Sequence, residues 1–349
     1  CTMLSQVTLP STLTELPEAA FYNCSYLPSF SVPATIKVIG NEAFYSCTAL
    51  KEVTLPEGVA SIGDYAFQNC QVLEQAKLPA SCTTLGKYVF DGCQALTALD
   101  VAEGNTAYLS QDGVLFTKDG ETLVRYPQAK AETAYTVPEG CRTLADWSFI
   151  GSTTLEQINI DGVTSIGEDC FYYCTSLKSI VIPDGVAELN GAVFGYCLSL
   201  EEVKLPATIW KLGDHCFYSC AKLNKIDLPE GLTTLGDQCF YNCVSLLEMN
   251  LPQTITEIGD QAIGYYTPSD SKDNTAKKID RLHVYNAGSN AVSQYIRQWK
   301  SDDYKYWIIS GAVAVVIVGG VIALISVRRY RNKIRPTSRH ASETKRKKK

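Results

Sequence analysis

A repeat of 23 residues governs what this chain can fold into. Phenylalanines recur at that interval in two series, from Phe21 to Phe90 and from Phe171 to Phe240, and Ile263 continues the second series. A unit of this length is too short to enclose its own apolar side chains, so the copies must stack on one another and share a core. The repeat therefore predicts a solenoid.

The unit over residues 50–70, LKEVTLPEGVASIGDYAFQNC, indicates the local structure of each copy. Its L-x-x-V-x-L start predicts a short strand with Val53 toward the core and Glu52 and Thr54 outward. Pro56 ends this strand, because proline donates no hydrogen bond to a ladder. A glycine four residues before the phenylalanine predicts a turn with positive φ, a conformation that glycine tolerates. Such glycines stand at 40, 63, 86, 167, 213, 236 and 259.

Stacked about 4.8 Å apart, about eleven such units span roughly 50 Å. We therefore predict an α/β-type leucine-rich-repeat solenoid over residues 1–300, with parallel strands on the concave face and short turns or helical pieces opposite them. The unit L-x-x-V-x-L-P-x-x-V-x-x-I-G-x-x-A-F-x-x-C resembles the repeat of BspA-like leucine-rich-repeat surface proteins. The resemblance implies a curved ectodomain on a microbial or protist cell that adheres to host proteins or to other cells.

The repeat is interrupted once and then fades. Between Phe90 and Phe149 the spacing exceeds one period, and turn dipeptides flanked by alternating apolar residues predict a β-meander near 103–138. A ligand-contacting protrusion and a tolerated insertion both stay open as its role, with the insertion favoured. After Ile263 a last strand and a helix with Val292 and Trp299 on one face predict a C-terminal cap near 279–300.

Trp307–Val327 is a segment of continuous uncharged sequence. At about 1.5 Å per residue, a helix of this length crosses a hydrocarbon core of roughly 30 Å. Eleven of the 31 basic residues follow it, against one of the 37 acidic residues. By the positive-inside tendency, residues 328–349 form a basic cytoplasmic tail, 301–306 a juxtamembrane segment and the preceding residues the ectodomain of a single-pass protein of the cell membrane.

Two further expectations follow from the ends of the chain. Gly319 and Ala323 are small residues four apart, which favours a weak dimer through the transmembrane helix. The chain begins at Cys1 in mid-repeat and without an export signal, so we expect a fragment or a processed form. The acidic body of the chain argues against a nucleic-acid partner, whose binding needs a positively charged folded surface.

The 14 cysteines in 349 residues are too few for a dense disulfide scaffold. Most follow the repeat, and three interpretations stay open for them: buried small side chains, which we favour, some disulfides, or a metal site. Equivalent side chains in parallel rungs point the same way, which disfavours disulfides, and zinc needs four convergent ligands. We therefore expect neither a metal nor a cofactor. Tyrosines that follow the phenylalanines form either a structural ladder, the favoured interpretation, or an aromatic recognition stripe.

The favoured function is a non-catalytic adhesin that binds host or neighbouring-cell proteins. A receptor that signals through a cytoplasmic adaptor and a passive surface-coat protein stay open as alternatives. An enzyme is not expected, because the chain has only three histidines and no catalytic motif. Concave solenoid surfaces commonly bind partners, so the outward strand residues are the candidate partner-binding residues. They are Glu52, Thr54, Gln75, Lys77, Gln157, Asn159, Ser179, Glu202, Lys204, Lys225, Asp227, Glu248 and Asn250.

Overall fold

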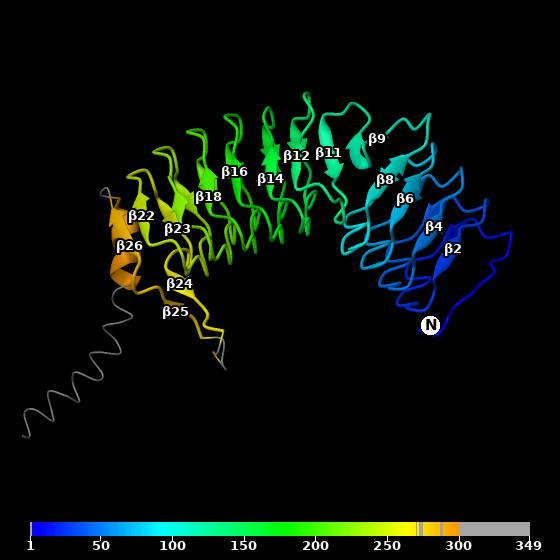
Figure 1. The fold of residues 1–349 in the computed structure, drawn as a ribbon, viewed down its shortest axis with the longest axis horizontal. Coiled ribbons are helices and arrows are strands. Elements are labelled where there is room, and N and C mark those ends of the chain that lie inside the picture. Colours follow the sequence, from blue (N-terminus) through cyan, green and yellow to red (C-terminus); the bar gives the residue numbers. More distant parts are fainter. Residues whose placement is uncertain (1, 270, 272–274, 287–288, 300–349) are drawn as a thin grey trace, which may run out of the picture. The chain divides into compact units, whose positions relative to one another are not determined.

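The structure is a computed structural model that describes residues 2–269, 271, 275–286 and 289–299. All its strands belong to one unit, Cys1–Val292, and a second unit comprises Ser293–Lys349. Within the first unit the chain winds through about eleven turns of a parallel β-solenoid, visible as successive rungs in Figure 1. The predicted solenoid is therefore confirmed.

Each rung begins with a strand from the L-x-x-V-x-L segment, and these strands form the first row. In β4, Val53 is buried while Glu52 and Thr54 are exposed, as the alternation predicts. Every pair within the row is parallel, so equivalent residues such as Phe30 and Val53 lie opposite each other. The row comprises β2 (Ser29–Ser31), β4 (Glu52–Thr54), β6 (Gln75–Leu78), β8 (Ala98–Val101), β12 (Ala134–Thr136), β14 (Gln157–Asn159), β16 (Ser179–Val181), β18 (Glu202–Lys204), β20 (Lys225–Ile226), β22 (Glu248–Leu251) and β26 (His283–Asn286).

A second, shorter strand follows in most rungs, where the sequence predicts a turn or a helical piece. Ile62 of β5 is buried, and β5 pairs in parallel with β3 and β7. The described rungs contain no helix, so the α/β expectation is replaced by two strand rows. The second row comprises β1 (Glu15–Leu16), β3 (Val38–Ile39), β5 (Ser61–Ile62), β7 (Thr84–Leu85), β13 (Thr143–Leu144), β15 (Ser165–Ile166), β17 (Glu188–Leu189), β19 (Lys211–Leu212), β21 (Thr234–Leu235) and β23 (Glu257–Ile258).

The repeated glycine ends the second strand for a reason other than the predicted one. Gly63 and its equivalents do not adopt positive φ. A Cβ at Gly63 would lie 2.6 Å from the backbone nitrogen of Asn41 in the preceding rung, so a side chain has no room there. The left-handed residues come two and six positions later, at Tyr65 and Asn69, both with φ 59°. The prediction of positive φ at the glycines is therefore wrong, because close rung-to-rung approach selects them.

The repeated phenylalanines stack along the core. The rings of Phe171 and Phe194 lie 5.4 Å apart with an interplanar angle of 1°, and the other neighbours in the two series stack in the same way. All are buried, and each buried ring contributes roughly 1.5–3 kcal/mol through removal of apolar surface from water. The following tyrosines also stack, as Tyr22 does on Tyr45 at 4.8 Å, which supports the structural-ladder interpretation.

Three strands lie between the two series of rungs: β9 (Tyr108–Gln111), β10 (Val114–Thr117) and β11 (Thr122–Arg125). They pair antiparallel with one another, and β11 then pairs in parallel with β13. The ring of Tyr126 stacks on Phe149 at 5.0 Å, so Tyr126 takes the place of the repeated phenylalanine. The segment between Phe90 and Phe149 is therefore a modified rung that carries an antiparallel hairpin.

The regular rungs end after β23. Two antiparallel strands follow, β24 (Tyr265–Tyr266) and β25 (Lys277–Lys278), and a helix covers residues 290–299, in which Val292 is buried. The described residues include no helix that is long and apolar enough to span a bilayer. The predicted transmembrane helix Trp307–Val327, the juxtamembrane segment and the basic tail lie outside the described residues.

Candidate functional site

The first-row strand face carries all the candidate partner-binding residues. Each lies on a first-row strand or, for Asp227, directly after β20. All are exposed except Glu202, which is half-buried, because the residues between them turn into the core. We call this surface the strand face; it consists of the 13 candidate residues together with Val181 and Tyr285.

The parallel register brings the C-terminal candidates together. Gln157, Ser179, Glu202 and Lys225 occupy equivalent positions in four successive strands. The ammonium of Lys225 lies 3.3 Å from the carboxylate of Glu202, an exposed ion pair that contributes little stability. Opposite charges thus alternate along this part of the face, and the fixed rung spacing holds them in a defined order.

The N-terminal candidates line a separate shallow groove. Its volume is about 410 Å³, and Glu52, Thr54, Gln75 and Lys77 all border it. Asp100 also borders it and lies opposite Lys77 in the register of β6 and β8. The hairpin-bearing rung comes between these strands and β12, so the structure groups the 13 candidates into two patches rather than one.

Two exposed apolar side chains on the strand face escaped the sequence interpretation. Val181 is 56% exposed and lies opposite Lys204, and Tyr285 is 53% exposed and lies opposite Asn250. The repeat register identifies Val181 as an outward position, which is the signal that was missed. Tyr285 lies beyond the last regular unit, where the spacing no longer predicts an orientation.

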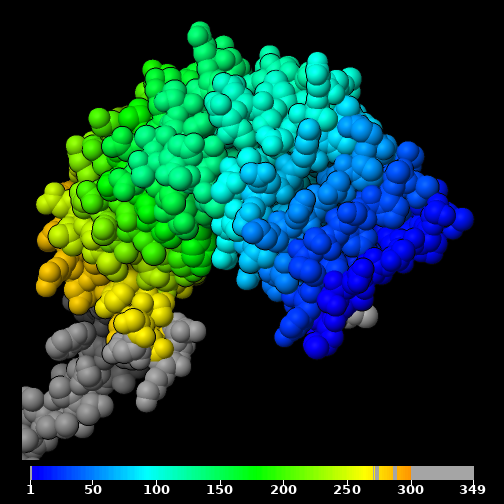
Figure 2. Space-filling view, turned by 45° about the vertical axis from the view of Figure 1, so that its right-hand side comes forward, coloured from blue at the N-terminus to red at the C-terminus, as the bar shows by residue number. Residues whose placement is uncertain are grey.

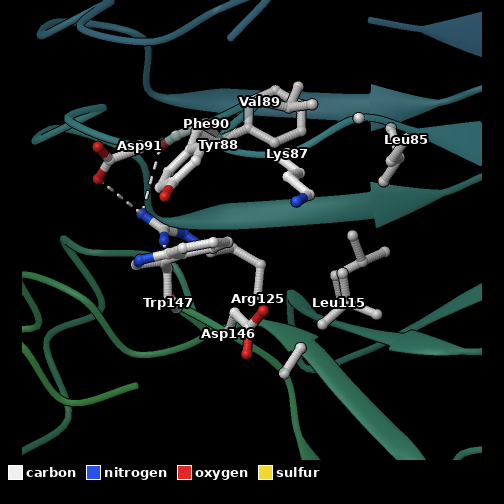
Figure 3. A pocket seen from close by; sticks show the side chains of 13 residues that line it. Leu85, Lys87, Tyr88, Val89, Phe90, Asp91, Leu115, Arg125, Asp146 and Trp147 are labelled. Atoms are coloured by element: carbon white, nitrogen blue, oxygen red, sulfur yellow. Dashed lines mark hydrogen bonds and ion pairs between the residues drawn. The ribbon is translucent and has the colours of Figure 1, made fainter. Parts of the chain in front are cut away.

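A pocket of about 230 Å³ lies where the modified rung meets the first series (Figure 3). Tyr88 and Trp147 both line it and are in contact with each other, with ring centroids 3.9 Å apart, and Leu115 and Leu85 add apolar lining. Burial is the main reason that the pKa of Tyr88 is raised to about 12, so its hydroxyl stays neutral. The pocket is small, and its walls come from the last rung of the first series, the modified rung and the rung of Phe149.

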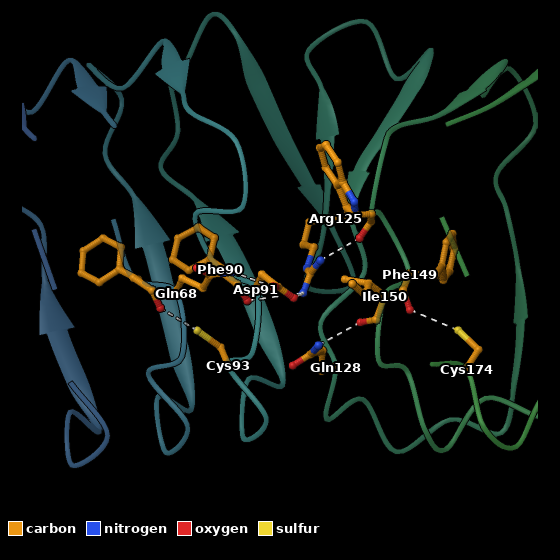
Figure 4. A network of polar contacts seen from close by, with 11 residues as sticks. Gln68, Phe90, Asp91, Cys93, Arg125, Gln128, Phe149, Ile150 and Cys174 are labelled. Carbon is orange, nitrogen blue, oxygen red and sulfur yellow. Dashed lines mark hydrogen bonds and ion pairs between the residues drawn. The ribbon is translucent and has the colours of Figure 1, made fainter. Parts of the chain in front are cut away.

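Arg125 is a buried cation beside this pocket. Its Nη1 donates to the carbonyl oxygen of Trp147 at 2.7 Å, and its Nη2 donates to that of Phe90 at 3.3 Å (Figure 4). A carboxylate oxygen of Asp91 lies 3.9 Å from Nη2, and the other accepts a hydrogen bond from Gln68. Burial lowers the pKa of Arg125, and the charge of Asp91 opposes that shift. The Arg125 guanidinium therefore links neighbouring rungs and does not offer a free charge to a ligand.

The cysteines of the repeat are buried hydrogen-bond donors. The thiol of Cys93 donates to the carbonyl oxygen of Phe67, and the thiol of Cys197 donates to that of Phe171, both at 3.2 Å. Burial raises the pKa of Cys93 to about 12, so the unreactive thiol form persists at neutral pH. All described cysteines are buried and none of them is in a disulfide, in keeping with the interpretation as small core side chains.

Candidate metal ligands do not cluster in the described part of the chain. No group of three or more His, Cys, Asp or Glu side chains there is placed to hold a metal ion. His215 packs beside Tyr218, and His283 lies on β26 opposite Glu248, so the two described histidines lie in different rungs. His340 lies outside the described residues.

Comparison with known families identifies the repeat. Residues 1–106 and 142–269 match the family described as BspA type leucine rich repeat region, in 6 copies. The chain belongs to this family. The unmatched residues between the two ranges contain the antiparallel hairpin. The family match is therefore interrupted at the modified rung, where the structure also departs from the regular repeat. No match was found among curated proteins.

Solved structures of bacterial leucine-rich-repeat proteins have similar folds. A leucine rich cell surface protein from Faecalibacterium prausnitzii is 28% identical with a TM-score of 0.62, over 75% of this chain and 65% of that one. The pneumococcal vaccine antigen PcpA is 27% identical with a TM-score of 0.65, over 82% of this chain and 68% of that one. A leucine-rich repeat protein from Eubacterium ventriosum, at 24% identity and a TM-score of 0.55 over 76% of this chain and 85% of that one, shares the fold. This BspA-type chain thus spans less than two thirds of the first relative.

Proposed function

We propose that this chain is a cell-surface adhesin whose strand face binds proteins of a host or of neighbouring cells. The observation that carries the proposal is the composition of the strand face. Exposed neutral, acidic and basic side chains lie there in fixed parallel register, and the exposed Val181 and Tyr285 lie among them. Alternating charges favour a specific protein partner with a complementary pattern over a uniformly charged polymer. Exposed aromatic and aliphatic side chains add the apolar contacts that interfaces need.

The rigidity of the face favours binding as well. Its strands are short, but neighbouring rungs within each series are held together by strand pairing in one or both rows and by backbone bonds such as that from the Phe44 amide to the Ala66 carbonyl, at 2.7 Å. A pre-ordered surface loses little conformational entropy when it binds. A typical stable interface needs about 800 Å² on each partner, and several adjacent rungs supply an area of that order.

Surface exposure is supported by the relatives. One similar structure is that of a leucine rich cell surface protein, and another is that of a vaccine antigen. We propose that the uncharged segment Trp307–Val327 anchors the chain in the membrane, with the repeats outside and residues 328–349 inside. Protease treatment of intact cells tests this topology: the repeats should be removed while a C-terminal epitope is retained. Full protection of the repeats would contradict it.

Binding of the purified full chain to immobilised host-matrix proteins tests the adhesin proposal. Saturable binding is expected, and the double variant Lys204→Glu/Lys225→Glu should weaken it at least tenfold, because both charges lie on the strand face. The matched control Lys118→Glu/Lys222→Glu makes the same change at two exposed lysines outside the candidate set. Equal binding by both variants would remove the strand face as the contact surface.

A further inference from the structure

A third surface hollow lies on the turn side of the modified rung, away from the strand face. Its volume is about 730 Å³, and the rungs of Phe90 and of Phe149 and Phe171 supply most of its walls. It is lined by Asn69, Asp91, Gly92, Gln94, Gln128, Ile150, Gly151, Thr153, Tyr172 and Tyr173. Side-chain amides and tyrosines therefore dominate its chemistry.

The hollow exists because the turn ladder stops there. In regular rungs the turn amides donate to the next rung, as Asn69 does to the Asp91 carbonyl and Gly151 does to that of Tyr172, both at 2.8 Å. Within the described residues, no matching backbone bond leaves Gly92 for the rung of Tyr126. Instead, Gln128 bridges forward with its side chain, donating to the Ile150 carbonyl at 2.9 Å. The two series are consequently separated at this row.

One tyrosine ring is left open at the edge of this hollow. Tyr173 stacks one face on Tyr196, with centroids 4.6 Å apart and an interplanar angle of 2°. The equivalent residue of the preceding rung is Gly151, which has no side chain to cover the opposite face. Tyr173 is accordingly 45% exposed, whereas its stacking partner Tyr196 is half-buried. An uncovered ring face is a platform for a flat apolar surface.

The polar groups around this platform have unused hydrogen-bonding capacity. In the described part of the chain, the side chains of Asn69, Gln94 and Thr153 make no hydrogen bond, and the buried Oε1 of Gln128 has no partner. Each amide offers both donors and an acceptor. Asp91 is the only carboxylate in the lining, and Arg125 and Gln68 already engage it. The lining therefore suits a neutral ligand rich in hydroxyl groups.

We propose that this hollow binds a neutral saccharide, with a pyranose ring on the open face of Tyr173 and its hydroxyls paired with the side chains of Asn69 and Gln94. The negative face of an aromatic ring attracts the C–H bonds that one side of a pyranose presents. Few polar groups around a concave site suffice to fix a ligand's orientation. A peptide is disfavoured, because Ile150 is the only aliphatic side chain in the lining and no strand edge borders it. The site is independent of the strand face.

An array of neutral oligosaccharides, probed with the purified full chain in a detergent without a sugar headgroup, tests the proposal. We expect saturable binding of at least one oligosaccharide. Saturation-transfer NMR with that saccharide should show the strongest transfer of saturation from the protein to the C–H protons of the pyranose ring. Tyr173→Ala should weaken binding about tenfold, whereas Tyr173→Phe keeps the ring and should bind nearly as the native chain does.

A blocking variant and its control keep the test decisive. Thr153→Trp should fill the hollow and abolish binding, while Thr175→Trp makes the same change at the same register position one rung away, outside the lining. Unchanged thermal unfolding verifies that each variant is folded. Absence of saturable saccharide binding, equal binding by Thr153→Trp and Thr175→Trp, or binding of short peptides in place of saccharides would each overturn the proposal.

Discussion

The Nη2 of Arg125 donates to the carbonyl oxygen of Phe90, over 3.3 Å, where regular rungs use a cysteine thiol. The position that would hold that cysteine is Ala129, and it has no side-chain donor. A buried guanidinium thus replaces the S–H group at the junction and also reaches Trp147 and Asp91. The modified rung keeps its carbonyls satisfied by a side chain from a different position.

Replacement of Arg125 should strongly destabilise the junction. Arg125→Met leaves the Phe90 and Trp147 carbonyls without this donor and Asp91 without its cation, so we expect a loss of about 3 kcal/mol in unfolding free energy. Urea denaturation followed by circular dichroism measures it. Arg142→Met is the control, because Arg142 is exposed and its guanidinium donates to the Gly162 carbonyl at the surface. Similar midpoints for the two variants would contradict the bridging role.

The thiol ladder should contribute measurable stability. Cys197→Ala removes the bond to Phe171 and leaves a small cavity, which should lower the unfolding free energy by about 1–2 kcal/mol. Cys82→Ala is a matched buried control, because the Cys82 thiol lies 3.8 Å from the Thr84 carbonyl and makes a weaker bond within its own rung. Calorimetry on both variants should show the larger decrease in Tm for Cys197→Ala; the reverse order would refute the argument.

Alkaline pH should destabilise the fold through the same thiols. Burial raises the pKa of Cys47 and Cys93 from about 9 to about 12, while the unfolded thiols ionise near 9. The unfolded state therefore loses protons first, so stability is fully present below pH 9 and falls as the pH rises toward 12. Urea midpoints at pH 8, 9 and 10 should decrease in that order. A variant with Cys47→Ala and Cys93→Ala should show a shallower decrease, and an equal slope would assign the effect to other groups.

The glycine that ends each second-row strand should resist substitution. A Cβ at Gly236 would lie 2.4 Å from the Asp214 nitrogen, so Gly236→Ala should cost about 2 kcal/mol of unfolding free energy through forced backbone displacement. Gly191→Ala is the control, since its nearest neighbour would be 3.9 Å away and its φ is not positive. Thermal melts of both variants decide the matter, and a stable Gly236→Ala would show that the rungs can separate without penalty.

Sequence periodicity predicted structural features that recur from rung to rung, but it did not predict features that occur in a single rung. The buried Val53, the ring ladder and the inward thiols all follow from one register that is copied along the chain. The second strand row escaped because Ser61–Ile62 is too short to show an alternation. The signal for the modified rung was present, since Tyr126 lies one period before Phe149. The role of Arg125 had no such signal, because it depends on a contact across the junction and occurs in a single rung.

The Phe90–Tyr126 junction has a mechanical consequence. Elsewhere a pull along the stack is shared by rows of backbone hydrogen bonds, but at the turn row of this junction no backbone bond among the described residues leaves the Gly92 amide for the next rung, and the Arg125 side chain makes the bond to the Phe90 carbonyl. A surface protein tethered at one end and holding a partner at the other would extend there first. Single-molecule stretching should therefore record a first unfolding event at low force, and Arg125→Met should lower that force further.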